Sequence, residues 1–202
     1  MRITGGTFGG LNLRVPKDDR IRPTQDRVRE ALFSMLQNDI PGCDFLDLFA
    51  GTGSAGLEAL SRGARSATFV EADGAHLAIL RENAKFCLKN SSQSRTTMIR
   101  ADVYRWIASY SGPGFSVVFA DPPYALGESR GYASVLSTLA AKGVVIPGGL
   151  FIAEMTAVQK AEETPGWELI KDRTYGKTRI SIWRRGQSNQ VEAETVHEQQ
   201  RG

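Results

Sequence analysis

The feature that most constrains the fold is the alternation of short apolar runs with helical segments between residues 45 and 155. The apolar runs are continuous, which is typical of strands buried on both faces. They lie at Phe45–Phe49, Ala67–Val70, Thr97–Arg100, Phe115–Ala120 and Leu150–Met155. Helices are predicted between them at Ser54–Arg62, through Leu77, Leu80, Ala84 and Leu88, at Val103–Ser109 and at Tyr132–Ala141. This alternation predicts an α/β fold, in which a parallel sheet is covered by helices on both faces.

Further elements are predicted on both sides of this alternation. Arg2–Thr4 and Leu11–Val15 predict a hairpin around a glycine-rich turn, and a helix with one apolar face begins near Gln25. Trp167–Arg173 and Thr178–Trp183 predict a second hairpin at one edge of the sheet. We therefore expect an N-terminal hairpin extension at residues 1–22, an α/β domain at residues 23–185 and a disordered polar tail at residues 186–202.

The composition is typical of one globular domain, with 41% hydrophobic and 23% charged residues among 202. The first residues lack the apolar stretch of a signal peptide and no apolar run reaches membrane-spanning length, so we expect a cytoplasmic protein. Cys43 and Cys87 lie too far apart for a Cys-x-x-Cys site. Residues 1–185 hold 24 basic and 19 acidic residues, a net charge of +5, and the first 14 hold Arg2 and Arg14 but no acid. This bias favours a polyanionic partner, although a solvated surface would give the same counts.

A glycine-rich turn, Gly51-Thr-Gly53-Ser-Ala-Gly56, joins the first strand of the alternation to its helix. Without Cβ atoms, its glycines allow a nucleotide-like ligand to lie against the backbone at the carboxyl end of the strand. A tight strand–helix connection without a ligand would use the same residues. Glu71, however, ends the next strand 18 residues after Gly53, where a carboxylate can accept hydrogen bonds from both hydroxyls of a ribose. The combination predicts a cofactor that contains a nucleoside.

The acids near the turn indicate which cofactor binds. Asp47 lies just before the turn, where a carboxylate suits the sulfonium or amino group of S-adenosylmethionine better than it suits a diphosphate. Asp47 can also brace the loop by accepting bonds from backbone N–H groups. Asp102 is placed to accept a bond from an adenine amino group, but capping the helix that begins at Val103 explains it equally well. S-adenosylmethionine is the predicted cofactor, and no metal is required.

A second motif, Asp121-Pro-Pro-Tyr124, directly follows the strand Phe115–Ala120. The prolines fix φ and remove two backbone donors, so the loop presents carbonyl groups. Asp121 and the Pro122 carbonyl can accept hydrogen bonds from the exocyclic amine of a base, while Tyr124 stacks on its ring. These bonds orient the nitrogen lone pair and stabilise the charge that develops on nitrogen. This interpretation makes Asp121, Pro122 and Tyr124 the catalytic residues of an amine methylation. The alternative is that the motif is an ordinary proline turn.

These motifs together resemble one known family, the RsmD-type small-subunit (16S) ribosomal RNA guanine-N2 methyltransferases of bacteria. The resemblance covers nearly all of the chain that we expect to be ordered. It rests on Met1-Arg-Ile-Thr-Gly-Gly6, Arg22-Pro-Thr-Gln-Asp-Arg-Val-Arg-Glu-Ala-Leu-Phe33, Asp47-Leu-Phe-Ala-Gly-Thr-Gly53 with Gly56-Leu-Glu-Ala-Leu-Ser-Arg-Gly-Ala64, and Asp121-Pro-Pro-Tyr124. The glycine and Asp-Pro-Pro-Tyr motifs occur in many amino-methyltransferases, whereas the Arg22–Phe33 segment is far more specific.

The resemblance implies a class I methyltransferase (Rossmann-like) fold, with a seven-stranded, mostly parallel sheet whose last hairpin strand runs antiparallel. It implies that Arg22 and Thr24 lie near the methionine end of the cofactor, Glu71 at the ribose and Asp102 at the adenine. The cofactor-binding residues that we expect are Arg22, Thr24, Asp47, Phe49, Gly51, Thr52, Gly53, Glu71, Asp102, Val103 and Asp121.

The resemblance also implies the substrate, a guanine N2 amine in small-subunit ribosomal RNA. We expect the protein to act as a monomer, and the RNA to be part of an assembling 30S particle. RNA contact is expected through Arg2, Arg14 and Arg22. Family members usually carry more basic residues in the stretch that is Gly9–Leu13 here. On the following helix, Arg27, Arg29 and Glu30 are interpreted as surface charges, and we prefer Arg22 as the functional residue because it precedes the rigid Pro23.

Three other functions are open. A DNA or RNA adenine-N6 methyltransferase would use the same tetrapeptide, but the DNA enzymes usually need an added recognition segment, and the chain has no unassigned stretch of that size. An NAD-binding oxidoreductase would explain the glycines but not Asp121–Tyr124. A non-catalytic RNA-binding protein on the same fold would not need intact acids at Asp47, Glu71 and Asp121.

Overall fold

The computed structural model describes residues 1–16, 23–89, 95–122 and 132–187. Seven strands form one sheet in the order β3-β2-β1-β4-β5-β7-β6. They are β1 (Asp44–Leu48), β2 (Ser66–Glu71), β3 (Arg95–Arg100), β4 (Phe115–Ala120), β5 (Val145–Thr156), β6 (Trp167–Tyr175) and β7 (Thr178–Arg185). The first five run parallel, and β7 is antiparallel to both β5 and β6. The predicted seven-stranded, mostly parallel sheet is confirmed.

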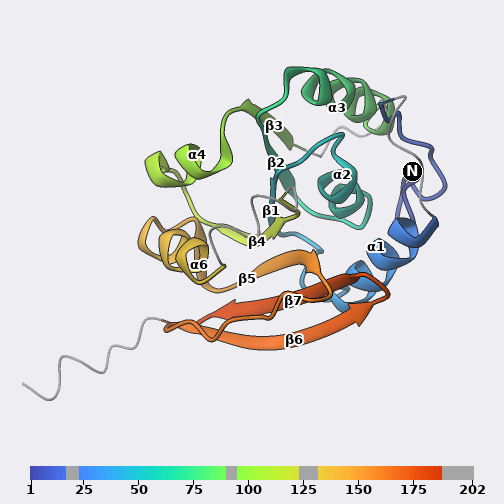
Figure 1. Ribbon diagram of the computed structural model, residues 1–202. Coiled ribbons are helices and arrows are strands. Elements are labelled where there is room, and N and C mark those ends of the chain that lie inside the picture. The colour runs from blue at the N-terminus through green and yellow to red at the C-terminus, as the bar shows by residue number, and fades with distance from the viewer. Residues whose placement is uncertain (17–22, 90–94, 123–131, 188–202) are drawn as a thin grey trace, which may run out of the picture.

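Helices cover both faces of this sheet (Figure 1). One face is packed by α1 (Pro23–Met35), α2 (Ser54–Ser61) and α3 (Gly74–Cys87), and the other by α4 (Val103–Ser109) and α6 (Tyr132–Ala141). Strand side chains alternate between the two cores, so that on β1 Phe45 faces α1–α3 while Leu46 and Leu48 face α4 and α6. Burial on both faces explains why the central strands are apolar along their length.

The N-terminal segment, residues 1–16, packs on the α1–α3 face, where Ile3, Phe8 and Leu13 are buried in the core. Its strand pairing is shorter than predicted, because the structure contains one antiparallel bridge between Arg2 and Asn12 in place of two strands. Backbone bonds from Ile3 N–H to the Leu11 carbonyl and from Leu13 N–H to the Met1 carbonyl flank this bridge. The glycine-rich turn is also held by α2, because Thr7 N–H donates to the Ser61 carbonyl at 2.7 Å, and a Cβ on Gly6 would lie 1.9 Å from that oxygen.

Most element boundaries lie within a few residues of the prediction. Helix α1 begins at Pro23 and not near Gln25, since proline is well suited to the first turn of a helix. Strand β5 begins at Val145 and not at Leu150, with a register shift between Phe115 and Val117 of its partner strand β4. Among the described residues, no helix is both long and apolar enough to cross a membrane. The carboxyl ends of β1, β4 and β5 meet at one edge of the sheet, where the candidate site lies.

Candidate functional site

The glycine turn leaves β1 with a strained backbone. Phe49 has φ 60°, which a residue with a bulky side chain rarely adopts, and Gly51 and Gly53 have φ 53° and 87°. A Cβ on Gly53 would lie 2.0 Å from Leu80 Cδ1, so close packing against α3 requires a glycine there. A Cβ on Gly51 would meet no atom within 4 Å, so its exposed side faces open space. The turn thus offers bare backbone to a ligand at the end of β1.

Asp47 braces this turn from beneath. It is 2% exposed, and its Oδ2 accepts a hydrogen bond from Gly56 N–H at 2.9 Å. Gly56 must be a glycine, because a Cβ would lie 2.2 Å from Phe69 Cε1. Burial raises the pKa of Asp47 to about 8; the Gly56 bond opposes this shift and the Glu71 carboxylate adds to it. The bracing role considered from the sequence is therefore present, and it leaves a carboxyl group that a cation would ionise.

Glu71, at the end of β2, lies directly beside the turn. Its Oε2 accepts a bond from Gly51 N–H and its Oε1 accepts one from Asp73 N–H, both at 2.7 Å. The side chain is largely buried, at 9% exposure. Each carboxylate oxygen has a second lone pair, so these backbone bonds leave capacity for hydroxyl donors from a ligand.

Asp102 is exposed and caps α4, since its Oδ1 accepts a bond from Arg105 N–H at 2.9 Å. The capping explanation weighed from the sequence is thus realised in the structure. Val103 is buried in the core under α4, and the ring of Phe49 contacts Tyr104 edge-on with a centroid distance of 5.7 Å. The start of α4 and the end of β1 therefore lie side by side, and Asp102 stands near the rim of the site.

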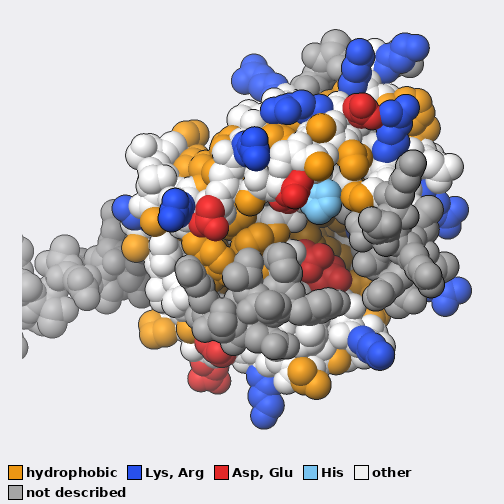
Figure 2. All heavy atoms as spheres, turned by 45° about the horizontal axis from the view of Figure 1, so that its top comes forward, with side chains coloured by type: hydrophobic (Ala, Val, Ile, Leu, Met, Phe, Trp, Pro, Cys, Tyr) orange, Lys and Arg blue, Asp and Glu red, His pale blue; other side chains and the backbone are white. Residues whose placement is uncertain are grey.

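Strand register brings Asp121 and Glu154 together. Ala120 pairs with Ala153, so Asp121 and Glu154 are the next residues on adjacent parallel strands. Their side chains continue the face of Phe119 and Ile152, which is also the face of Asp47. Figure 2 shows acidic side chains in a hollow whose walls include hydrophobic groups. Three carboxyl groups, of Asp47, Asp121 and Glu154, thus converge at the ends of three adjacent strands.

The electrostatics of this convergence are unusual. Asp121 is accessible to solvent, yet the protein around its carboxyl group raises its pKa well above the ordinary value. The carboxylates of Glu154 and Asp47 raise it further. Burial also raises the pKa of Glu154, with Arg29 opposing the shift. The described charges that act on Asp47 and Asp121 are therefore all negative. Within the described ranges, no group of three or more acids, histidines and cysteines has the arrangement of a metal site.

Several predicted residues lie outside the described part of the chain. These are Arg22 and Tyr124, and the side chain of Thr24, whose backbone lies in the first turn of α1. Pro122 is described and buried next to Asp121. Thr52, within the turn, is also buried, and its carbonyl accepts a bond from Asn83 Nδ2 at 3.0 Å.

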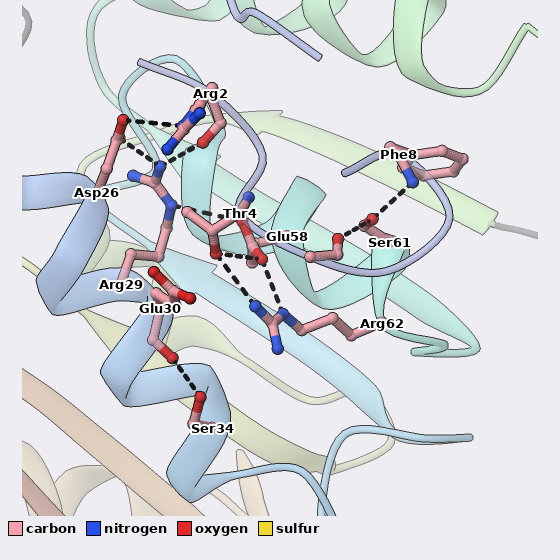
Figure 3. A network of polar contacts seen from close by, with 12 residues as sticks. Arg2, Thr4, Phe8, Asp26, Arg29, Glu30, Ser34, Glu58, Ser61 and Arg62 are labelled. Atoms are coloured by element: carbon pink, nitrogen blue, oxygen red, sulfur yellow. Dashed lines mark hydrogen bonds and ion pairs between the residues drawn. The ribbon is translucent and has the colours of Figure 1, made fainter. Parts of the chain in front are cut away.

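The N-terminal segment is fixed by a buried acid that sequence reasoning missed, Glu58 of α2. Glu58 is fully buried, and its carboxylate accepts bonds from Thr4 N–H, Thr4 Oγ1 and Arg62 Nε, all at 2.7 Å (Figure 3). Arg29 Nε lies 3.6 Å from the same carboxylate. Glu58 is the charged residue of the short helix α2, whose other residues are apolar or small, and this was the signal that could have identified it.

The interpretation of Arg29 as a surface charge is wrong. Its side chain is 8% exposed, and it donates to the Arg2 carbonyl and to Asp26 Oδ1, the latter at 2.8 Å (Figure 3). Arg29 lies beside the apolar stripe of α1, and the N-terminal segment covers its side chain. The helical periodicity of α1 cannot show this contact, because the covering residues lie outside the helix. The positive charge of Arg29 also lowers the pKa of Glu154, so Arg29 links this segment electrostatically to the candidate site.

The arginines expected to contact RNA reach the surface beside carboxylates. The side chain of Arg2 is 64% exposed, with Nε 3.8 Å from Asp26 Oδ2. That of Arg14 is 74% exposed and forms an ion pair with Glu82. The backbone of Arg14 is fixed by Asn83, whose Oδ1 accepts from Arg14 N–H at 2.8 Å while Nδ2 donates to the Arg14 carbonyl at 3.0 Å. Asn83 therefore bridges the N-terminal segment and the glycine turn, another role that sequence reasoning missed.

Comparison with known proteins gives consistent results. The family model described as conserved hypothetical protein 95 matches residues 1–184. The chain is 36% identical over 177 residues to the Haemophilus influenzae protein named Ribosomal RNA small subunit methyltransferase D, covering 87% of this chain and 89% of that one. It is 31% identical to the Escherichia coli protein of the same name, covering 96% and 94%. A solved structure described as putative methyltransferase yhhF from Escherichia coli superimposes with a TM-score of 0.78 at 33% identity, covering 92% of this chain and 98% of that one.

Proposed function

Because the chain belongs to the family described as conserved hypothetical protein 95, we propose that it transfers a methyl group from S-adenosylmethionine to the exocyclic N2 amine of a guanine in small-subunit ribosomal RNA. The names of its relatives support methylation of small-subunit ribosomal RNA. The choice of the guanine N2 amine rests on the resemblance carried by Arg22–Phe33. The observation that carries the chemistry is the convergence of Asp47, Asp121 and Glu154 beside a bare glycine turn.

The residues around the turn fit S-adenosylmethionine. The open space at Gly51 admits a ligand against the backbone, and three acids of the described chain match its donor groups. Glu71 would hold the ribose hydroxyls, Asp102 the adenine amino group and Asp47 the cationic part. Arg22 and Thr24 would hold the methionine end, with Phe49, Thr52, Gly53 and Val103 completing the cradle. When bound, the cofactor supplies a methyl group on a positively charged sulfur, whose charge complements the carboxyl groups of Asp47 and Asp121.

Asp121 and Pro122 would hold the acceptor amine. The carboxylate of Asp121 and the Pro122 carbonyl accept its two N–H bonds, and Tyr124 stacks on the base. This arrangement aims the nitrogen lone pair and stabilises the charge that forms on nitrogen. The raised pKa of Asp121 also suits it to take up the proton that the methylated amine loses near neutral pH. Glu154, beside Asp121, adds to the negative potential at the same point.

We place RNA contact at Arg2, Arg14 and Arg22, whose guanidinium groups suit phosphates. Of these, Arg2 and Arg14 lie on the surface of the described chain. The proposed substrate is RNA in an assembling 30S particle, in which the target base must be turned outward to reach Asp121. A monomer suffices, because the residues assigned to cofactor and amine all come from one chain.

The proposal is tested by methyl transfer. The purified protein is incubated with labelled S-adenosylmethionine and 30S particles from cells that lack the modification, and the RNA is then digested to nucleosides. We expect label in N2-methylguanosine of the small-subunit RNA. Label in N6-methyladenine of DNA or RNA would identify the alternative methyltransferase. Binding to the particle without any transfer would identify a non-catalytic RNA-binding protein.

A further inference from the structure

A groove separates the N-terminal segment from α3 on the same side of the sheet. Its volume is about 630 Å³, and its walls include Asn12 and Arg14 on one side and Lys85, Phe86 and Lys89 on the other. The ring of Phe86 is 57% exposed, although isolated exposed apolar residues are common on protein surfaces. What distinguishes Phe86 is its position among three cations in one groove.

Basic side chains continue along α3. Arg81 and Lys85 are one helical turn apart on one side of α3, and Lys89 follows just after its end; all three are exposed. They also line a second, adjoining hollow against β3. Figure 2 shows lysine and arginine side chains gathered toward the top of the view, where α3 lies in Figure 1. Glu82 is the acid that lines the groove, and its charge is paired with Arg14.

We infer that this groove binds single-stranded RNA, with Lys85, Lys89 and Arg14 on phosphates and Phe86 stacked on a base. The inference rests on the proposed RNA substrate. Cations spaced around an exposed aromatic ring match a polyanion whose bases are unpaired, because a base in a duplex has no free face for the ring. An acidic protein surface would satisfy the lysines but gain little from the ring.

The groove is connected to the candidate site through one side chain. Asn83 lines the groove and donates to the Thr52 carbonyl in the glycine turn. The same residue fixes the backbone of Arg14 on the opposite wall. Asn83 therefore joins both walls of the groove to the turn that forms the proposed cofactor cradle.

The test measures binding of a fluorescein-labelled, mixed-sequence RNA of about 12 nucleotides to the full chain over a range of salt concentrations. For Lys85→Ala/Lys89→Ala, the slope of log affinity against log salt should become less steep by about 1.4, since each phosphate contact on a single strand contributes about 0.7. Lys142→Ala/Lys160→Ala removes the same charge from exposed positions outside the groove and should leave the slope unchanged.

The ring is tested separately. Phe86→Leu should weaken binding about 5- to 150-fold at every salt concentration with an unchanged slope, as expected for loss of one stacked base, while Phe86→Trp should retain affinity. Equal effects of the two lysine pairs, or full affinity in Phe86→Leu, would overturn the inference. The inference would also be overturned if a loop-free RNA duplex bound as tightly as the single strand. It would be overturned, too, if polyglutamate displaced the labelled RNA equally well from the native chain and from Phe86→Leu.

Methyl transfer by the same variants to 30S particles separates the two proposals. Groove-dependent RNA binding by a protein that transfers no methyl group would contradict the proposed function and leave the groove assignment standing. Normal transfer by every groove variant, with unchanged RNA affinity, would remove the groove assignment alone.

Discussion

Two groups of acids lie on the same face of the sheet, and their surroundings are opposite. Glu58, in the N-terminal network, accepts three hydrogen bonds and has the guanidinium groups of Arg62 and Arg29 beside it. Asp47 is nearly as buried, but it accepts a bond from the Gly56 amide, and the described charge that acts on it is the carboxylate of Glu71. Asp121 is likewise influenced by Glu154 and Asp47.

The difference separates architecture from function. A buried carboxylate with nearby cations is compensated within the folded chain, so its contribution is to hold segments together. A cluster of three carboxyl groups near a single arginine, Arg29, is not fully compensated in the free protein, which is typical of a site where a ligand supplies the missing charge. We therefore assign Glu58 to the docking of the N-terminal segment, and the carboxyl groups at the strand ends to a cationic cofactor and an amine.

The largest effect is expected at Glu58. Glu58→Gln leaves Arg62 and Arg29 without their buried counter-charge, which should lower the free energy of unfolding by about 3–5 kcal/mol. Urea denaturation measures the loss. Glu82→Gln is the control, because it breaks an exposed ion pair with Arg14 and should cost less than about 1 kcal/mol. Similar losses in the two variants would mean that Glu58 is not compensated as the network suggests.

Asp121 should behave in the opposite way. Asp121→Asn removes a negative acceptor of the amine without disturbing a salt bridge, so we expect methyl transfer to fall about 10²- to 10³-fold with little change in folding stability. Isothermal calorimetry should show that S-adenosylmethionine binding is largely retained. If cofactor binding disappeared together with transfer, Asp121 would be a cofactor ligand and not the acceptor of the amine.

The carboxyl groups at the strand ends should also make stability depend on pH. Asp47 has a pKa of about 8 in the folded protein, against an ordinary value of 3.8. Between these values the folded chain keeps a proton that the unfolded chain has released, so stability should fall as pH rises through this window, by at most about 1.4 kcal/mol per pH unit. Asp121 and Glu154, whose pKa values are also raised, act in the same direction.

Asp47→Asn tests this dependence. Asparagine keeps the shape and can still accept the bond from Gly56 N–H, but it has no proton to release. Denaturation at pH 5 and pH 8 should show a smaller difference in stability for the variant than for the native chain. An unchanged difference would mean that Asp47 is already ionised in the folded protein and is compensated in the way that Glu58 is.

The sequence predicted the parts of the molecule that depend on local pattern. The apolar runs located the parallel strands, and Gly51–Gly53 located the turn, because burial on both faces and positive φ leave local traces. Glu58 and Asn83 were missed because their partners, Thr4 and Arg14, are 54 and 69 residues away along the chain. Glu154 was missed because its role appears only when the register of β4 and β5 places it beside Asp121.

The smallest expected effect concerns Asp102, whose two roles can be separated. Asp102→Ala should lower stability by about 1 kcal/mol, because the cap on Arg105 N–H is lost. Asparagine is an equally good cap, so Asp102→Asn should keep stability, and any weaker binding of S-adenosylmethionine in calorimetry would then report loss of the carboxylate alone. A control is Asp73→Asn, which makes the same exchange at the cap of α3 and should not alter cofactor affinity. Equal affinity in Asp102→Asn and the native chain would make Asp102 a structural acid like Glu58, and would restrict ligand recognition to Glu71 and the carboxyl groups at the strand ends.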